Sequence, residues 1–153
     1  MIQIRPYNDS DKSAVLNLLR LNTPTFFAPA EEKDFLHYLE NELEDYFVVV
    51  ENDNIHGAGG INYLPSEKIA RISWDIIAPE FQGKGIGKEL VKHRLHLLRE
   101  NPDIKLIVVR TSQHTFRFYE KMGFEIKQVV KDFWAEGFDL YEMWYLKNQN
   151  VNP

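Results

Sequence analysis

Cysteine does not occur anywhere in the 153 residues of this chain. A protein without cysteine has no disulfide bonds, no thiolate nucleophile and no zinc site built on cysteine. This absence does not identify a cellular compartment by itself. It does exclude the disulfide-stabilised small domains and the cysteine-dependent enzymes.

Long apolar segments are also missing. The first residues, 1–6, lack the charged-then-apolar layout of a signal peptide. No apolar run approaches the ~20 residues that a helix needs to span a bilayer. We therefore expect a cytoplasmic protein that is not associated with a membrane.

An excess of basic residues is lacking as well. Lys and Arg number 18 against 23 Asp and Glu, which leaves a formal net charge of −5. The overall field of such a chain repels polyphosphate and favours cations. Nucleic acid is therefore not an expected partner.

The length and composition are those of one ordinary globular domain. Hydrophobic residues make up 44% of the chain and charged residues 27%. We expect a single domain over 1–147 and a frayed tail over 148–153. Aromatic residues, at 13%, suffice for both a core and an aromatic-lined pocket, and composition does not decide between them.

The N-terminal part shows strand and helix patterns in turn. We expect a strand at 2–5, a helix containing 14–19 with capping residues at 8–11, and an amphipathic helix at 31–44. The segment between the two helices is bounded by Pro24 and Pro29. It carries Phe26 and Phe27, which we expect to be exposed in a loop.

The middle of the chain alternates strand patterns with turns, and the C-terminal part mixes both periodicities. We expect strands at 46–50, 55–64 and 70–78, a helix at 85–100, a strand at 104–110, a helix at 111–122, and strands at 124–131 and 138–146. The first three of these strands should form an antiparallel meander. The whole indicates a mixed α/β fold.

A glycine-rich turn connects the strand that ends near Ala78 to the following helix. Gly83, Gly85 and Gly87 permit positive φ and a close approach of a ligand to the backbone, so that N–H groups can converge on an anion. The neighbouring Lys84 and Lys88 add positive charge, which suits a pyrophosphate. A tight turn without any ligand explains three glycines equally well.

Two nucleotide-binding motifs do not fit this turn. A P-loop around Lys88 requires glycine and Ser/Thr where the chain has Gln82 and Glu89. A dinucleotide fingerprint requires a third glycine after Gly83 and Gly85, and the chain has Lys88 there.

Two segments carry a family resemblance. Residues 82–87, Gln-Gly-Lys-Gly-Ile-Gly, are similar to the Q/R-x-x-G-x-G/A acyl-CoA loop of the GCN5-related N-acetyltransferases (GNAT). Residues 118–124, Phe-Tyr-Glu-Lys-Met-Gly-Phe, resemble the F-Y-x-x-x-G-F segment at the end of the fourth main helix of that family. Together they cover about the C-terminal half of the chain. The chain departs from the pattern at Ser112 and Thr115, where members often carry Asn and Ala.

The resemblance implies the acyl-CoA N-acyltransferase fold: a mixed, mostly antiparallel twisted sheet, splayed between its fourth and fifth strands and flanked by about four helices. It also implies acetyl-CoA as cosubstrate, without a metal, with the pantetheine arm in the splay. The residues that it assigns to acetyl-CoA are Ile76 and Ile77 through their backbone, the turn residues Gln82, Gly83, Lys84, Gly85, Ile86, Gly87 and Lys88, and Ser112 and Tyr119. For Ser112, a helix-capping role is the alternative.

The implied reaction is acetyl transfer to a primary amine by direct attack in a ternary complex. The amine must be neutral, although an alkylamine has a pKa of roughly 10.4. Asp75, a carboxylate among apolar neighbours, is the first candidate for the base, and a structural carboxylate is the alternative. Weaker candidates are Glu32, Glu67, His37 and His114. Tyr119 matches the family residue that protonates the departing thiolate, with a packing aromatic as the alternative.

The acceptor is expected to be a small-molecule or protein amine. Segments that line the acceptor site in similar proteins carry Phe26, Phe27 and Trp134, and Trp74 lies beside Asp75; core packing is the alternative for each. A homodimer is compatible with these patterns. Two other functions stay open: a non-catalytic acyl-CoA-binding sensor of the same fold, and a phosphate-binding module unrelated to CoA.

Overall fold

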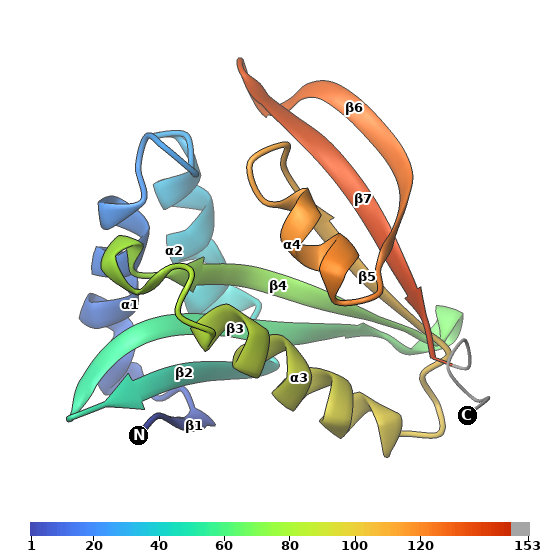
Figure 1. Cartoon of the computed structure of the whole chain (residues 1–153), viewed down its shortest axis with the longest axis horizontal. Coiled ribbons are helices and arrows are strands. Elements are labelled where there is room, and N and C mark those ends of the chain that lie inside the picture. Colours follow the sequence, from blue (N-terminus) through green and yellow to red (C-terminus); the bar gives the residue numbers. More distant parts are fainter. Residues whose placement is uncertain (148–153) are drawn as a thin grey trace.

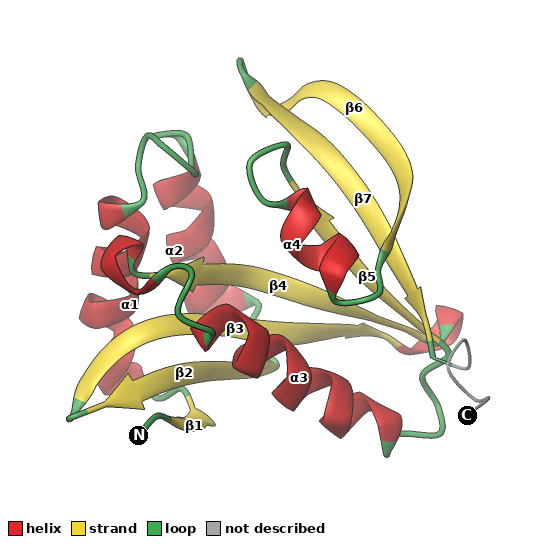
Figure 2. Cartoon of the chain, in the orientation of Figure 1, coloured by secondary structure: helices red, strands yellow, loops and turns green. Residues whose placement is uncertain are grey.

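The computed structural model describes residues 1–147, so the predicted tail at 148–153 lies outside the described residues. Within them, one sheet of seven strands has the order β1-β2-β3-β4-β5-β7-β6 (Figure 2). The strands are β1 (Gln3–Pro6), β2 (Asp45–Glu51), β3 (Asn54–Leu64), β4 (Ile69–Ile77), β5 (Leu106–Thr111), β6 (Glu125–Ala135) and β7 (Phe138–Leu146). The α-helices are α1 (Lys12–Leu21), α2 (Glu31–Asn41), α3 (Ile86–Arg99) and α4 (Phe116–Lys121), and short 3-10 turns η1 (Asp9–Asp11), η2 (Pro65–Glu67) and η3 (Pro79–Phe81) join them.

Most of these elements match the sequence patterns, and the antiparallel meander of β2, β3 and β4 is confirmed. The prediction of a helix over 111–122 is wrong for its first half, because α4 begins only at Phe116. Thr111 still belongs to β5, where it pairs with Tyr141 of β7. The carbonyl of Ser112 then accepts hydrogen bonds from the N–H groups of Thr115 and Phe116, so a turn precedes α4. Strand pairing and this turn override the local helix pattern.

The helices cover both faces of the sheet, as Figure 1 shows. On one face, α1 and α2 pack Val15, Leu19 and Phe35 against buried residues of β2 and β4. On the other, α3 and α4 pack Leu90 and Tyr119 among the second group of buried residues. Each face therefore has its own apolar core.

The sheet opens between β4 and β5. These two strands are parallel and pair only from Ile69–Ile72 with Leu106–Val109, whereas β4 continues to Ile77. Figure 1 shows the two ribbons side by side at one end and diverging toward the other. The predicted mixed, mostly antiparallel sheet, splayed between its fourth and fifth strands, is confirmed.

A β-bulge lies in β4 beside this opening. Ala58 pairs with Ile76 and Gly60 with Ser73, so two residues of β4, Trp74 and Asp75, lie opposite Gly59. Trp74 has φ +49°. Because side chains alternate along a strand, one extra residue exchanges the faces of all that follow. The bulge thus directs Asp75 toward α3.

None of the helices within residues 1–147 is both long enough and apolar enough to cross a bilayer.

Candidate active site

A cavity of about 430 Å³ lies where β4 and β5 diverge. Its walls come from the loop between α1 and α2, from α2, from β3 to β5, and from the hairpin of β6 and β7. Among the lining residues are all four predicted acceptor-site aromatics, namely Phe26, Phe27, Trp74 and Trp134. Asp75, Ser112 and Tyr119 line it too. The fold therefore brings residues from both halves of the chain to one cavity.

Phe26 and Phe27 are half-buried, which corrects the expectation that they are exposed. Phe27 stacks on Trp74 with ring centroids 6.2 Å apart, and Phe26 meets His114 edge-on at 6.3 Å. Trp74 in turn packs against Phe35 at 4.9 Å. The loop is therefore anchored by its two aromatic rings, which pack on Trp74 and His114.

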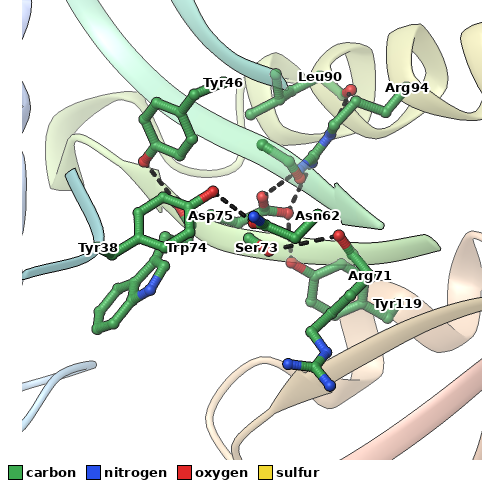
Figure 3. A network of polar contacts seen from close by, with 11 residues as sticks. Tyr38, Tyr46, Asn62, Arg71, Ser73, Trp74, Asp75, Leu90, Arg94 and Tyr119 are labelled. Carbon is green, nitrogen blue, oxygen red and sulfur yellow. Dashed lines mark hydrogen bonds and ion pairs between the residues drawn. The ribbon is translucent and has the colours of Figure 1, made fainter. Parts of the chain in front are cut away.

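Asp75 forms an ion pair with Arg94 of α3 (Figure 3). Arg94 Nη1 donates to Asp75 Oδ1 at 2.5 Å, and Nη2 donates to Oδ2 at 2.8 Å. The guanidinium also donates to the carbonyls of Gly60 and Leu90. Burial alone would lower the pKa of Arg94, but the charge of Asp75 and its hydrogen bond outweigh it, and the pKa is raised. Arg94 is thus a cation with no exposed side-chain surface.

Tyr119 completes this group. Its hydroxyl donates to Asp75 Oδ2 at 2.5 Å, and its side chain is 4% exposed. Burial, and next the negative charge of Asp75, raise the pKa of Tyr119 well above the ordinary value for tyrosine. The hydroxyl therefore keeps its proton at neutral pH and is held by Asp75 (Figure 3), in a residue that lines the cavity.

Arg94 is a residue that sequence reasoning missed, although a signal was present. It stands four residues after Leu90 and four before Leu98, on the buried stripe of α3. A charge at such a position requires a buried partner. Asp75, offered above as a base with a structural alternative, is that partner.

Gly83 and Gly85 in the glycine-rich turn have φ +77° and +89°. A Cβ at either position would meet nothing within 4 Å, and both residues are exposed. The turn leads directly into α3, whose first N–H groups lack partners inside the helix. The turn lies outside the lining of the cavity. Its geometry offers an open, positively polarised surface for an anion.

Gly87 serves another purpose. A Cβ there would lie 3.3 Å from Cζ of Phe118 and 3.7 Å from Ile77. The glycine thus allows α4 to pack closely on the start of α3. This contact joins the two segments that carry the family resemblance.

The backbone of β4 near the turn is held by two side-chain amides. The carbonyl of Ile77 accepts from Asn22 Nδ2 at 3.0 Å and from Gln82 Nε2 at 3.3 Å, and Gln82 also donates to Asn22 Oδ1. Ile76 is buried and pairs with Ala58. The side chain of Gln82 therefore anchors the turn to the end of α1. Asn22 is buried at that end, and no pattern in the sequence indicated that it would contact the turn.

Ser112 is buried, and its hydroxyl accepts from the N–H of His114 at 3.2 Å. The side chain therefore stabilises the turn before α4, and the residue also lines the cavity. The exposed Lys84 lies with its ammonium 5.3 Å from the ring of Phe81, and Lys88 is exposed on α3.

Among the weaker candidates for the base, none of the four lines the cavity. Glu32 pairs with Arg20 on the surface. Glu67 and His37 are exposed, and His114 lies between Phe26 and Phe138.

Glu31, which sequence reasoning passed over, does line the cavity. It is buried, and its carboxylate accepts from the N–H of Ala28 at 2.8 Å. Burial raises its pKa, and the N–H of Ala28 opposes that shift. Within residues 1–147, no group of three or more His, Asp or Glu side chains is placed to hold a metal ion.

Residues 13–124 match the model of the acetyltransferase (GNAT) family. The chain belongs to this family. It is an acyltransferase, and the fold implied by the resemblance is confirmed.

Individual relatives of this GNAT chain are distant in sequence. A Bacillus subtilis (strain 168) protein, provisionally named as a ribosomal protein bS18-alanine N-acetyltransferase, is 26% identical over 137 residues, which is 87% of this chain and 89% of the relative. The Escherichia coli ribosomal-protein-S18-alanine N-acetyltransferase has a similar structure, with a TM-score of 0.79 at 15% identity over 100% of both chains. An aminoglycoside 6'-N-acetyltransferase complexed with coenzyme A gives a TM-score of 0.77 at 16% identity, covering 95% and 97% of the two chains.

Proposed function

We propose that this protein transfers the acetyl group of acetyl-CoA to a primary amine by direct attack in a ternary complex. One observation carries the proposal. The hydroxyl of Tyr119, protonated and held by the Asp75–Arg94 pair, meets the cavity where β4 and β5 diverge. The glycine-rich turn, with its open positive-φ residues, adjoins the same end of β4.

The turn is proposed to bind the pyrophosphate through the backbone of Gly83 and Gly85 and the first turn of α3, with Lys84 and Lys88 adding charge. Gln82 and Gly87 contribute by shaping the turn, through Asn22 and Phe118 respectively. The backbone of Ile76 and Ile77 and the buried Ser112 border the opening that would take the pantetheine arm. Acetyl-CoA supplies the thioester carbonyl that the amine attacks.

Tyr119 is proposed as the proton donor. The amine nitrogen forms a bond to the carbonyl carbon, the carbon–sulfur bond breaks, and sulfur leaves with the bonding electrons as a thiolate. An alkyl thiol has a pKa of about 8.5, so a nearby acid eases its departure. The hydroxyl hydrogen now points to Asp75. A turn about the Cζ–Oη bond directs it to the sulfur, and the proton that the amine loses restores the hydroxyl.

For Asp75 the contacts favour positioning Tyr119 over deprotonating the amine. Both of its oxygens accept from Arg94, and one accepts from Tyr119 as well. Its oxygens therefore already have donors from the protein itself. Glu31, at the other wall of the cavity and with a raised pKa, is the better placed carboxylate for accepting the proton of the amine. Asp75 as the base stays a prediction.

The relatives named above act on a protein alanine and on an aminoglycoside, according to their names, so the family context leaves the acceptor open. The aromatic walls formed by Phe26, Phe27, Trp74 and Trp134 suit an acceptor with an apolar part. The alternative function is a non-catalytic sensor that binds acetyl-CoA in the same place.

The first experiment measures the melting temperature with acetyl-CoA at 100 times its Kd. A ligand that binds only the native state stabilises it there by about 2.7 kcal/mol, or roughly 5–10 °C for a domain of this size. NAD and ATP should have little effect. Release of free thiol over a panel of amines then tests turnover.

Gly85→Val should abolish the shift, because a β-branched residue at positive φ distorts the turn. Gly137→Val is the matched control, since Gly137 has φ +82° and similarly open surroundings in the hairpin of β6 and β7. Its acetyl-CoA shift should persist. No shift with the unaltered protein would overturn the proposed function, and a shift without turnover of any amine would favour the sensor.

A further inference from the structure

Two arginines line the cavity between β4 and β5, and the surface that they form is called the cavity floor below. Arg71 comes from β4 and Arg110 from β5. Arg71 pairs with Val108, and Arg110 lies two residues further along β5, so the side chains share one face of the sheet. The positive charge of Arg71, after burial, is a cause of the lowered pKa of Arg110. Two like charges thus meet at one place.

Arg71 has no counter-charge within residues 1–147. Its Nε is buried and has no hydrogen-bond partner, and no ion pair among the described residues includes it. Figure 3 shows its guanidinium extending away from Arg94, whose own charge is matched by Asp75. A buried donor left without an acceptor is unfavourable, which makes this part of the site incomplete by itself.

Arg110 is oriented but only weakly neutralised. Its Nε lies 3.9 Å from Glu142 Oε1, at the limit of an ion pair. Its guanidinium lies 5.0 Å from the ring centre of Phe133 and 5.6 Å from that of Trp134. Such stacking holds a guanidinium in place while its N–H groups stay available.

The acidic residues of the cavity do not cancel these charges. Asp75 is engaged by Arg94, and Glu31 accepts from the backbone of Ala28. Glu42 is exposed at the rim and contacts His37. The floor between β4 and β5 is therefore cationic, although the chain as a whole is acidic.

We propose that the acceptor is a small amine that also carries an anionic group, a carboxylate or a phosphate, and that Arg71 and Arg110 bind this group. The inference rests on the proposed function and narrows its substrate class. Arginine presents a planar fork of donors that matches both anions bidentately. A cavity of about 430 Å³ has the size of a small-molecule site. The α-amine of a peptide lacks an adjacent carboxylate and would leave the guanidinium groups of Arg71 and Arg110 without an anionic partner.

The test compares matched pairs of amines by kcat/KM in the thiol-release assay. Phenylalanine is set against phenethylamine and leucine against isoamylamine for the carboxylate, and phosphoethanolamine against ethanolamine for the phosphate. We expect at least one acid-bearing member to exceed its partner by roughly 10-fold or more, since each charge-assisted hydrogen bond contributes that much. The carboxylate pairs and the phosphate pair together show which of the two anions the site prefers.

Arg71→Gln should reduce this preference by roughly 10- to 100-fold, mainly through KM. Arg99→Gln, an exposed arginine at the end of α3, is the matched control and should keep the preference. A melting curve checks the fold of each variant, and Arg110→Gln repeats the test should Arg71→Gln not fold. The preferred acid should also raise the melting temperature in the presence of coenzyme A, and Arg71→Gln should remove that shift.

Equal or better use of the amines without an anionic group would overturn the inference, as would an unchanged preference in folded Arg71→Gln and Arg110→Gln. A failure of this inference is distinguishable from a failure of the proposed function. In the first case the acetyl-CoA shift and amine turnover persist, and in the second they are absent.

Discussion

Arg94 is the largest side chain among those that residues 1–147 bury completely. A buried charge is tolerated only when it is paired and hydrogen bonded, and such a pair is rarely a net source of stability. Arg94 donates to the carboxylate of Asp75 and to two backbone carbonyls. The arrangement is best explained by what it does to Tyr119, whose hydroxyl it fixes at the cavity edge.

Tyr119→Phe keeps the ring and removes only the hydroxyl. We expect kcat to fall by about 10²- to 10⁴-fold, the range for loss of a general acid, on an acceptor for which chemistry limits the rate. The variant should fold, with stability reduced by about 1.5–3 kcal/mol for a lost hydrogen bond to a charged group. Acetyl-CoA should still raise its melting temperature.

Tyr46→Phe is the matched control for Tyr119→Phe. Its hydroxyl is also buried and donates to the carbonyl of Trp74, but the residue does not line the cavity. Stability should fall while turnover stays within about threefold. If Tyr119→Phe also turned over within a few fold of the unaltered protein, water would replace Tyr119 as the proton donor.

At the scale of elements, the bulge in β4 decides which partners Asp75 has. Ile72 faces the core under α3, and a regular strand would bring residue 74 to that face next. The extra residue brings Asp75 there and Trp74 to the aromatic residues of α2. Gly59, opposite the bulge, leaves room for the ion pair, because a Cβ there would overlap Asp75 Oδ1 and lie 2.9 Å from Arg94 Nη1.

Gly59→Ala should therefore disturb the ion pair and lower the stability by about 1–3 kcal/mol, the usual cost of overpacking. Turnover should fall more than acetyl-CoA binding, since Tyr119 loses its fixed partner. A double-mutant cycle with Asp75→Ala provides the control. The cost of Gly59→Ala should shrink in the Asp75→Ala background; equal costs in both backgrounds would show that the clash lies elsewhere.

At the scale of the whole molecule, the cavity is shared by the N-terminal and C-terminal parts of the chain. Phe26, from the loop between α1 and α2, contacts His114, which follows β5, and His114 also contacts Phe138 of β7 with ring centroids 5.6 Å apart. These rings link the two sides of the splayed sheet. The acceptor is therefore proposed to bind between the two parts, on the face covered by α1 and α2.

Phe26→Ala should raise KM for the acceptor by roughly 10-fold, because a half-buried aromatic wall is lost. The shift produced by acetyl-CoA should be unchanged, since the side chain of Phe26 lines the cavity and the glycine-rich turn does not. Leu21→Ala, at the exposed end of α1 beside the same loop, is the control and should leave KM unaltered. A large loss of stability with an unchanged KM would instead identify Phe26 as a core residue.

The sequence by itself determined the order and type of nearly all elements, and it located the glycine-rich turn. Those features depend on local rules: the period of apolar residues, and the positive φ that Gly83 and Gly85 adopt. The two segments at 82–87 and 118–124 were enough to recognise the family, because each is continuous in the chain. The helix start before Phe116 was misjudged, since pairing of Thr111 with β7 is not a local property.

Only the tertiary structure decided the partners inside the site. The face on which Asp75 lies depends on a one-residue bulge, and its pairing with Arg94 depends on where α3 crosses β4. Arg71 and Arg110 meet because β4 and β5, separated in the chain by α3, pair in one register. Contacts between distant segments follow from register and packing, and no local pattern of residues encodes these.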